Sequence, residues 1–315
     1  MNIRELDLNL LLVFNAIYIE RSISKAARKL GMSQPAVSNA LRRLRHFTGD
    51  TLFYKAGTGV SPTRAAMTLS VPISHALDTV ERGLSSVRSF DPATSARTFR
   101  IGVNDLIHDV LVPALVGLTR REAPNIMLEF VLQDSERSAE LVKGGEIDLA
   151  LLPHFAVSED LASQKVWDER FVVIMSRSHP YAKRERLTKD DLRELNFVAT
   201  THVKRLRSFI DDIFRSHGID RKVACAVADT HNVYPLVSVS DLVAVAGLIF
   251  VERYNTDESL VIFDTPFPLP KIDVHVAWTK EADADEGHKW IRDHVIEILT
   301  SAFRMHDRVK PSGSH

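Results

Sequence analysis

Residues 22–45, with the sequence SISKAARKLGMSQPAVSNALRRLR, constrain the fold more than any other stretch of this chain. Their spacing predicts two short helices joined by a turn at Gly31. Val37, Leu41 and Leu44 recur at helical intervals in the second helix and predict its inner face. The opposite face carries amide, hydroxyl and guanidinium groups and no carboxylate, namely Gln34, Ser38, Asn39, Arg42 and Arg43. Such groups hydrogen-bond to base edges and pair with phosphates, so the pattern predicts a helix-turn-helix whose second helix enters the major groove of DNA.

The residues at the helix ends favour the same interpretation. Ser22 or Ser24 can cap the first helix, and Gly31 suits a chain that leaves a helix in a left-handed conformation. Ser33 is placed to cap the second helix, and Pro35 falls in its first turn, where a missing N–H is harmless. An ordinary helical hairpin with a solvated charged face is the alternative, and these signals together favour the DNA-binding motif over it.

Charge is unevenly distributed along the chain. The 315 residues exceed the usual length of one domain, and 45% hydrophobic residues supply an ample core. Residues 1–65 hold ten Lys and Arg against four Asp and Glu, a net charge of +6. The whole chain has a formal net charge of −1, so residues 66–315 carry −7. A basic head on an acidic body suits a nucleic-acid module joined to a domain of another kind.

Cysteine usage and hydropathy indicate the compartment. The single cysteine, Cys225, excludes an intrachain disulfide, suits a reducing compartment, and in the run VACAVA is expected to be a buried strand residue. The first residues lack a signal peptide and instead predict an amphipathic helix through Leu10, Val13, Phe14, Ile17 and Tyr18. Apolar runs nowhere reach the roughly 20 residues that span a bilayer, so we expect a cytoplasmic protein without a membrane partner.

Two further features follow the helix-turn-helix. Residues 51–63 predict a small hairpin, or wing, that turns at Gly57-Thr58-Gly59, with Lys55 and Arg64 placed to contact phosphates. Residues 64–88 then predict one long helix with an apolar seam at heptad spacing, formed by Ile73, Leu77, Val80, Leu84 and Val87.

We expect this seam to mediate self-association, because the preceding residues offer little surface to cover it. Packing against the second domain of the same chain is the alternative. Pro72 is expected either to kink the helix or to mark its true start.

Residues 89–97 form a polar hinge, and the remainder alternates between strand-like and helix-like segments. Strands are predicted at 99–103, 127–132, 147–152, 171–176, 197–200, 223–228, 242–246 and 272–278. Helices are predicted near 105–121, 136–143, 189–194, 204–217, 231–238 and 286–304. This alternation predicts an α/β architecture with mainly parallel sheets, in two similar lobes with a ligand-binding cleft at the strand ends.

The predicted strand ends locate candidate pocket residues. In the first lobe the opening strand ends at Asn104, before a helix whose N-terminal N–H groups can receive an anion. In the second lobe the corresponding positions are Thr200, Thr201, His202 and Lys204, a polar corner suited to a carboxylate or a phenol. Plain helix capping by Asn104 and Thr201 is the alternative at each position.

Residues 7–66 resemble the LysR-type transcriptional regulators over about sixty positions in register. The opening DLNLL, the ending SNALRRLR and the closing SPTRAA of the wing resemble the branch of nodulation and aromatic-degradation regulators. By this resemblance the DNA-binding residues are Ser33, Gln34, Pro35, Ser38, Asn39, Arg42, Arg43, Lys55 and Arg64.

The resemblance also implies a domain plan. A winged helix-turn-helix occupies 1–65, a dimerising linker helix 66–88, a hinge 89–97, and a two-lobed Rossmann-like effector domain, similar to periplasmic binding proteins, 98–304. The lobes comprise 98–166 plus 268–304, and 167–267, and 305–315 form a disordered tail.

The function implied is that of a transcriptional activator, working as a homodimer or homotetramer on promoter DNA with RNA polymerase and a small co-inducer. By the resemblance, Leu111, Glu169 and Phe267 fall near the family's pocket walls or its crossover strands. A phenol or an aromatic acid is the expected co-inducer, and Glu169 would favour a neutral phenol because it repels a carboxylate.

Two alternative classes share the two-lobed fold. A solute-binding protein is disfavoured by the basic N-terminal module and the lack of a signal peptide. An enzyme is disfavoured because the chain has no HExxH, GxSxG or phosphate-loop motif. Residues 282–288, ADADEGH, depart from a calcium loop, and the thirteen histidines show no close metal spacing. We therefore expect no catalytic residues, no metal and no cofactor besides the co-inducer.

Overall fold

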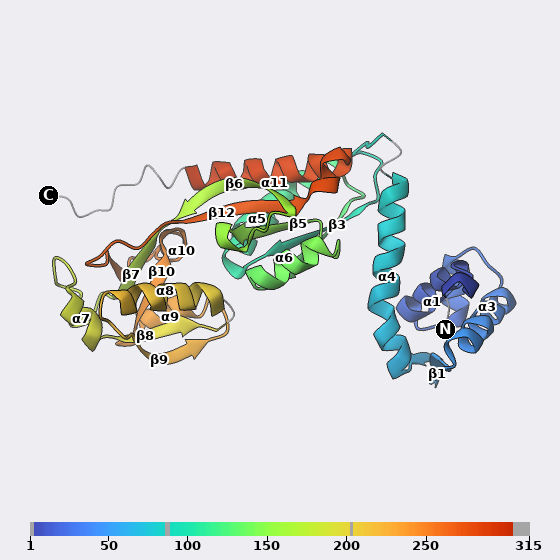
Figure 1. Cartoon of the computed structure of the whole chain (residues 1–315), viewed down its shortest axis with the longest axis horizontal. Helices are drawn as coiled ribbons and strands as arrows, with labels where there is room; N and C mark the ends of the chain where they lie inside the picture. Colours follow the sequence, from blue (N-terminus) through green and yellow to red (C-terminus); the bar gives the residue numbers. More distant parts are fainter. Residues whose placement is uncertain (1–2, 86–88, 202–203, 305–315) are drawn as a thin grey trace. The chain divides into compact units, whose positions relative to one another are not determined.

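The computed structural model describes residues 3–85, 89–201 and 204–304, and separates into two units, Met1–Ser89 and Phe90–His315 (Figure 1). Each unit is described by itself. The predictions for Val87, His202 and the tail at 305–315 lie outside the described residues. Among the described helices, none is both long and apolar enough to cross a membrane.

The first unit is a winged helix-turn-helix. A short 3-10 turn at Ile3–Glu5 precedes three helices, α1 (Asn9–Glu20), α2 (Ile23–Lys29) and α3 (Gln34–Thr48). The wing strands β1 (Phe53–Ala56) and β2 (Gly59–Pro62) follow, and then the long helix α4 (Arg64–Ser85). The inner faces of α1, α2 and α3 pack into one core with Phe14, Ile17 and Val37 fully buried. The predicted motif is confirmed, because its apolar positions converge on this core.

The helix caps and the turn glycine are found where the sequence predicted them. Ser22 caps α2 by accepting a hydrogen bond from the Lys25 N–H (3.4 Å), and Ser33 caps α3 by accepting from the Ala36 N–H (3.3 Å). Gly31 has the left-handed φ of 64° between the two helices.

The wing is closely fitted to the turn between α1 and α2. Val60 N–H donates to the main-chain oxygen of Arg21 (2.9 Å), and a Cβ atom at Gly59 would lie only 2.4 Å from that oxygen. The glycine is therefore required by a close approach of two backbones.

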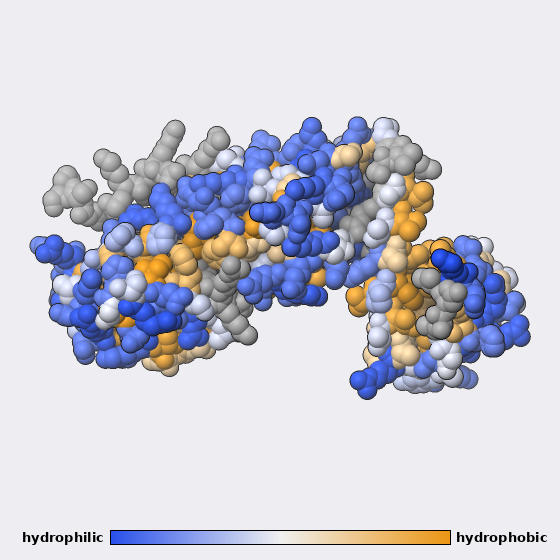
Figure 2. All heavy atoms as spheres, in the orientation of Figure 1, coloured by the Kyte–Doolittle hydropathy of each residue, from blue (hydrophilic) through white to orange (hydrophobic). Residues whose placement is uncertain are grey.

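The structure of α4 differs in part from the predicted apolar seam. Ile73 is buried and Leu77 half-buried against the core of α1–α3, so the expectation that nothing in the preceding residues covers them is wrong. Val80 and Leu84, on the same side of α4 but farther along it, are 60% and 68% exposed. Hydrophobic side chains accordingly gather along α4 and the adjoining helices (Figure 2). Pro72 does not start the helix, which begins at Arg64 and continues through the proline.

The second unit contains two sheets. The first has the order β4-β3-β5-β12-β6, formed by Met127–Leu132, Thr98–Val103, Leu149–Pro153, Ile272–Thr279 and Leu161–Glu169. The second has the order β11-β7-β10-β8-β9, formed by Leu260–Phe263, Phe171–Ser176, Val243–Gly247, Asn196–Thr200 and Lys222–Val227. Each sheet with its helices makes one lobe, which confirms the predicted two-lobed α/β class.

Helices cover the sheets of both lobes. The first lobe carries α5, α6 and α11, at Asp105–Glu122, Ser135–Lys143 and Glu286–Arg304, and α11 packs against α5 and β6 (Figure 1). The second carries α7, α8, α9 and α10, at Lys189–Glu194, Lys204–Ser216, Val233–Ser238 and Leu248–Tyr254.

The sheets are mixed, where mainly parallel sheets were expected. β3 runs parallel to β4 and β5, and β8 runs parallel to β9 and β10, whereas β6, β7, β11 and β12 pair antiparallel. The antiparallel strands are those that carry the chain between lobes. β6 and β11 were not predicted: β6 is interrupted by polar residues at 163–165, and β11 is only four residues long. Cys225 is only half-buried, since its strand β9 also lies at a sheet edge.

The crossover between lobes lies later than predicted. β6 stays in the first sheet as far as Glu169, which pairs with Ile272 on β12, and β7 begins the second sheet at Phe171. The predicted boundary at 166/167 therefore falls inside a strand of the first sheet.

Candidate nucleic-acid interface and ligand cavity

The outer face of α3 is free of carboxylates and open to solvent. Every residue predicted to face DNA in this segment is exposed, namely Ser33, Gln34, Pro35, Ser38, Asn39, Arg42 and Arg43. Ser24 Oγ donates to Gln34 Oε1 (3.1 Å), and Arg42 donates to Asn39 Oδ1 (2.8 Å). These contacts orient the amides and the guanidinium group on one face, as groove recognition requires.

One acidic group reaches this face from outside the helix. Asp7 forms an ion pair with Arg43 at 3.0 Å. The backbone N–H of Asn9, first among several donors that include Arg43, holds the pKa of the Asp7 carboxyl below its usual range. Arg43 is thus partly neutralised, whereas Arg42 forms no ion pair among the residues that the structure describes.

Arg45 on the same helix stabilises the fold and does not face outward with the recognition residues. It donates to the main-chain oxygens of Thr51 (2.7 Å) and Phe53 (2.6 Å) and so ties α3 to the first wing strand. Lys55 on β1 and Arg64 at the start of α4 are both exposed, as phosphate contacts must be. The recognition helix and the wing therefore form one rigid surface.

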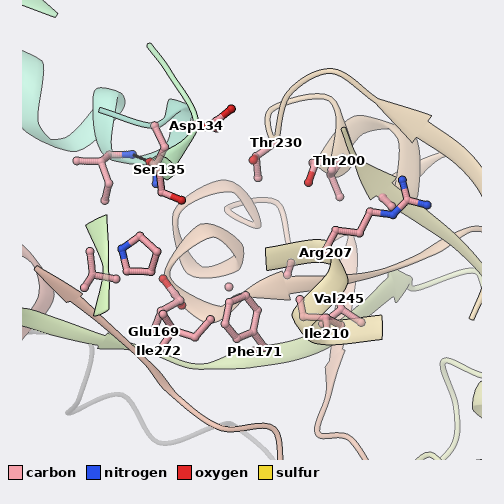
Figure 3. A pocket seen from close by; sticks show the side chains of 18 of the residues that line it. Asp134, Ser135, Glu169, Phe171, Thr200, Arg207, Ile210, Thr230, Val245 and Ile272 are labelled. Carbon is pink, nitrogen blue, oxygen red and sulfur yellow. Dashed lines mark hydrogen bonds between the residues drawn. The ribbon is translucent and has the colours of Figure 1, made fainter. Parts of the chain in front are cut away.

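The second unit holds a cavity of about 230 Å³ between its lobes (Figure 3). The first lobe contributes the carboxyl ends of β3, β4 and β5, and the second contributes those of β8 and β10. Apolar walls come from Phe155, Trp167, Phe171, Val198 and Ile272. Figure 3 shows the Glu169 carboxyl directed into the space that Ser135, Thr200 and Thr230 face from the other sides.

Three of the predicted pocket residues line this cavity. They are Asn104, Glu169 and Thr200. Asn104 also caps α5, since its Oδ1 accepts from the Ile107 N–H (2.9 Å), so capping and lining coincide there.

Other predicted pocket residues lie elsewhere. Leu111 is fully buried in the core of the first lobe, and Phe267 is buried in the core of the second, where its ring stacks on His217 at 4.2 Å. Thr201 is exposed and donates to the main-chain oxygen of Val227 (3.2 Å), outside the cavity lining. The assignment of these three residues to this cavity is wrong. Leu111 and Phe267 pack inside the lobe cores, and the Thr201 hydroxyl is bonded to the backbone. Lys204 begins α8, and its side chain is outside what the structure describes.

Sequence reasoning missed most of the cavity wall. Trp167, Phe171, Ser135, Arg207 and Arg221 line it, and none was predicted. The one available signal was position: Trp167 precedes Glu169 by two residues, and alternate residues of a strand share a face.

Glu169 is the most unusual group in the cavity. Burial raises the pKa of its carboxyl to about 7, although the Trp167 indole and the backbone N–H groups of Ile249, Leu248 and Arg170 act in the opposite direction. A Cβ atom at Gly247 would lie 2.8 Å from the Glu169 Cδ atom. The glycine therefore keeps room for the carboxyl.

Two arginines at the opposite wall share one carboxylate. Arg221, which is buried, donates from Nε to Asp211 (2.7 Å), and Arg207 Nε lies 3.7 Å from the same residue. Burial lowers the pKa of Arg221, with Asp211 opposing that shift. The side chain of Arg207 lies near Thr200 in Figure 3, with its guanidinium turned away from Glu169.

A polar clasp joins the lobes beside the cavity. Asp109 on α5 accepts from the Tyr254 hydroxyl and lies 2.9 Å from His231 Nε2, while Arg253 donates to its main-chain oxygen (2.9 Å). Burial, and then the Asp109 carboxylate, raise the pKa of Tyr254 to about 12. We call Asp109, His231, Arg253 and Tyr254 the lobe clasp.

Comparison with known proteins places both units in one family. Residues 8–67 match the family described as "Bacterial regulatory helix-turn-helix protein, lysR family", and residues 92–300 match the "LysR substrate binding domain". The chain belongs to the LysR family. It is a DNA-binding transcriptional regulator with a substrate-binding domain, and not an enzyme.

Relatives and structures agree with this assignment. The HTH-type transcriptional activator NagR of Ralstonia sp is 31% identical over 96% of this chain and 100% of its own length. Nodulation protein D 1 of Bradyrhizobium sp. (strain NC92) is 30% identical over 98% of each chain. The crystal structure of a probable transcriptional regulator from Pseudomonas aeruginosa, 28% identical, superposes with a TM-score of 0.72 over 95% of this chain and 98% of that one.

Proposed function

We propose that this protein is a cytoplasmic transcriptional activator that binds promoter DNA as a homodimer or homotetramer and responds to a small aromatic co-inducer. The observation that carries the proposal is the presence, in one chain, of two features: an exposed face on α3 whose own residues include no carboxylate, and an aromatic-walled cavity between two lobes. The similarity to activators such as NagR supports activation over repression, with RNA polymerase as the partner at the promoter.

The cavity supports an aromatic ligand on physical grounds. Its volume of about 230 Å³ suits a small molecule, and Phe155, Trp167 and Phe171 supply flat apolar surfaces. A ligand that touches both lobes favours one lobe arrangement by the difference in its affinity for the two arrangements. Through the covalent link of α4 and the hinge, that difference alters how the protein occupies promoter DNA.

The DNA-binding part is tested by a gel shift with the DNA directly upstream of the protein's own coding sequence. Arg42→Ala and Gln34→Ala remove groove-facing groups and are expected to weaken binding by about 1–3 kcal/mol each. Arg215→Ala, which removes an exposed arginine from α8, is the matched control and is expected to leave binding unchanged. Unchanged affinity in both α3 variants would show that α3 is not the recognition helix.

The ligand-response part is tested with a reporter fused to the same promoter. We expect single-ring aromatics to raise reporter output several-fold over the ligand-free level. A response only to non-aromatic metabolites would refute the aromatic class while leaving the regulator assignment intact.

A further inference from the structure

The turn between the recognition helix α3 and the wing contains a backbone conformation that leucine rarely adopts. Leu52 has a φ of 56°, in the left-handed region, and its side chain is fully buried in the core of the first unit. A left-handed conformation costs free energy in a residue with a Cβ atom, and it persists only where the surroundings hold it. The contacts that hold Leu52 therefore identify what this turn fixes.

The Asp50 carboxylate holds Leu52 directly. Its Oδ1 atom accepts the N–H of Leu52 (2.6 Å) and the hydroxyl of Thr63 (2.8 Å). Thr63 Oγ1 also accepts the N–H of Ala66 in the first turn of α4 (3.1 Å), as a helix cap does, and the Thr63 N–H donates to the main-chain oxygen of Leu52 (2.8 Å). One carboxylate oxygen thus joins the turn that follows α3 to the residue that caps α4.

The same turn is tied to α3 from its other side. Arg45, in the last turn of α3, donates to the main-chain oxygens of Thr51 (2.7 Å) and Phe53 (2.6 Å). Gly49 ends α3 with a φ of 68°, and its N–H donates to the main-chain oxygen of Arg45 (2.9 Å). The wing lies at the start of α4 (Figure 1). Residues 49–53, which we call the helix joint, are therefore bonded to the end of one helix and the beginning of the other.

Asp50 acts in the helix joint as a hydrogen-bond acceptor. It forms no ion pair among the residues that the structure describes, although residues 1–65 carry a net charge of +6. Both of the hydrogen bonds that its carboxylate accepts end at Oδ1. Asparagine also carries an acceptor oxygen at this position, so it can make the same two bonds without the charge.

We propose that Asp50 and Thr63 are positioning residues for DNA recognition, which fix the angle between α3 and α4. In a dimer that associates through α4, this angle determines how far apart, and in what orientation, the two copies of α3 meet the DNA. Asp50 and Thr63 thereby select the spacing between half-sites, while the exposed residues of α3 read the bases. This inference rests on the proposed homodimer.

The test measures half-site spacing with the full-length protein. In vitro selection from a random DNA library identifies the preferred sequence, in which a homodimer yields two related half-sites. Gel shifts then compare a probe of the selected spacing with probes that have one base pair more or fewer between the half-sites. Each change moves a half-site by about 3.4 Å and rotates it by about 35° around the DNA axis. We expect the original protein to bind the altered probes about tenfold more weakly.

Two pairs of substitutions loosen or retain the helix joint. Asp50→Ala removes the shared acceptor and is expected to reduce the spacing penalty to about twofold, because a looser joint lets α3 follow a displaced half-site. Asp50→Asn keeps the acceptor and is expected to retain the penalty. Thr63→Val loses the hydroxyl and Thr63→Ser keeps it, so they form the second pair. Thr68→Val is the matched control, because the Thr68 hydroxyl donates to the main-chain oxygen of Arg64 inside α4 (3.1 Å).

The ratio of affinities distinguishes positioning from plain destabilisation. A variant that is only less stable loses affinity for every probe by the same factor, so its spacing penalty stays at that of the original protein. A thermal melt of each variant establishes that it folds. If Asp50→Ala does not fold, the two substitutions of Thr63 carry the comparison.

The outcomes distinguish this inference from the homodimer on which it rests. A spacing penalty that Asp50→Ala and Thr63→Val lose, and that Asp50→Asn and Thr63→Ser keep, supports the positioning role. A full penalty in both Asp50→Ala and Thr63→Val, or an equal loss in Asp50→Asn and Asp50→Ala, overturns that role and leaves the homodimer intact. Selected sequences that contain a single half-site overturn the homodimer and the spacing role together.

Discussion

Glu169 makes the stability of the second unit depend on pH. Burial disfavours the charged form and raises the pKa of its carboxyl from the usual 4.5 to about 7 in the folded chain. The folded state therefore binds this proton more tightly than the unfolded state. The stabilisation from the bound proton is complete below pH 4.5 and is lost as the pH rises through about 7.

Replacing Glu169 by glutamine removes this dependence. At pH 8 we expect the free energy of unfolding of Glu169→Gln to exceed that of the original protein by up to about 3 kcal/mol, because each pKa unit corresponds to about 1.4 kcal/mol. At pH 4.5 the two proteins are expected to differ little. Urea unfolding at both pH values measures the difference, and an equal effect at both would contradict the assignment of Glu169 as the titrating group.

At the scale of single elements, α4 divides its apolar seam between two tasks. Ile73 and Leu77 pack on α1–α3 and stabilise the first unit, whereas Val80 and Leu84 have no cover within that unit. Two large exposed aliphatic side chains on one side of a helix favour contact with a second copy, as in a two-helix seam. We therefore expect the later half of the seam to carry dimerisation.

A charge at Leu84 tests this division. Leu84→Asp is expected to lower the oligomer mass measured by light scattering and to weaken promoter binding, because a buried unpaired charge costs several kcal/mol. Val239→Asp, at a position 83% exposed in the second unit, introduces the same charge and is the control. An unchanged mass in Leu84→Asp would exclude this part of α4 from the dimer interface.

At the scale of the second unit, the lobe clasp opposes separation of the lobes around the cavity. Its members come from residues 109, 231, 253 and 254, so it exists only when both lobes are packed. A ligand that contacts both lobes binds more tightly when the lobes are already held together, because less motion is lost on binding.

Removing one hydroxyl from the lobe clasp is therefore expected to weaken ligand binding. Tyr254→Phe should lower phenol affinity by about tenfold, the value of one hydrogen bond to a charged group. Tyr234→Phe is the matched control, because Tyr234 donates to Asp257 entirely within the second lobe. Calorimetric titration of both variants decides the matter: equal losses would mean that the clasp has no special part in ligand binding.

The local features of this chain were determined by its sequence alone. Helical spacing of Val37, Leu41 and Leu44, the caps Ser22 and Ser33, and Gly31 act within a few residues, so they predicted the helix-turn-helix without knowledge of the fold. Apolar runs such as 127–132 and 171–176 likewise predicted strands with the observed bounds. Asn104 and Thr200 were found because strand ends define a cleft in any fold of this kind.

Only the tertiary structure decided which distant residues meet. The pairing of Asp7 with Arg43, the cover over Ile73, the lobe clasp and the neighbourhood of Trp167, Glu169 and Gly247 join positions far apart in the chain. Whether a polar or apolar side chain is covered depends on the packing of elements around it, and periodicity does not specify that packing. Leu111 and Phe267 entered lobe cores for this reason, while Trp167 reached the cavity wall.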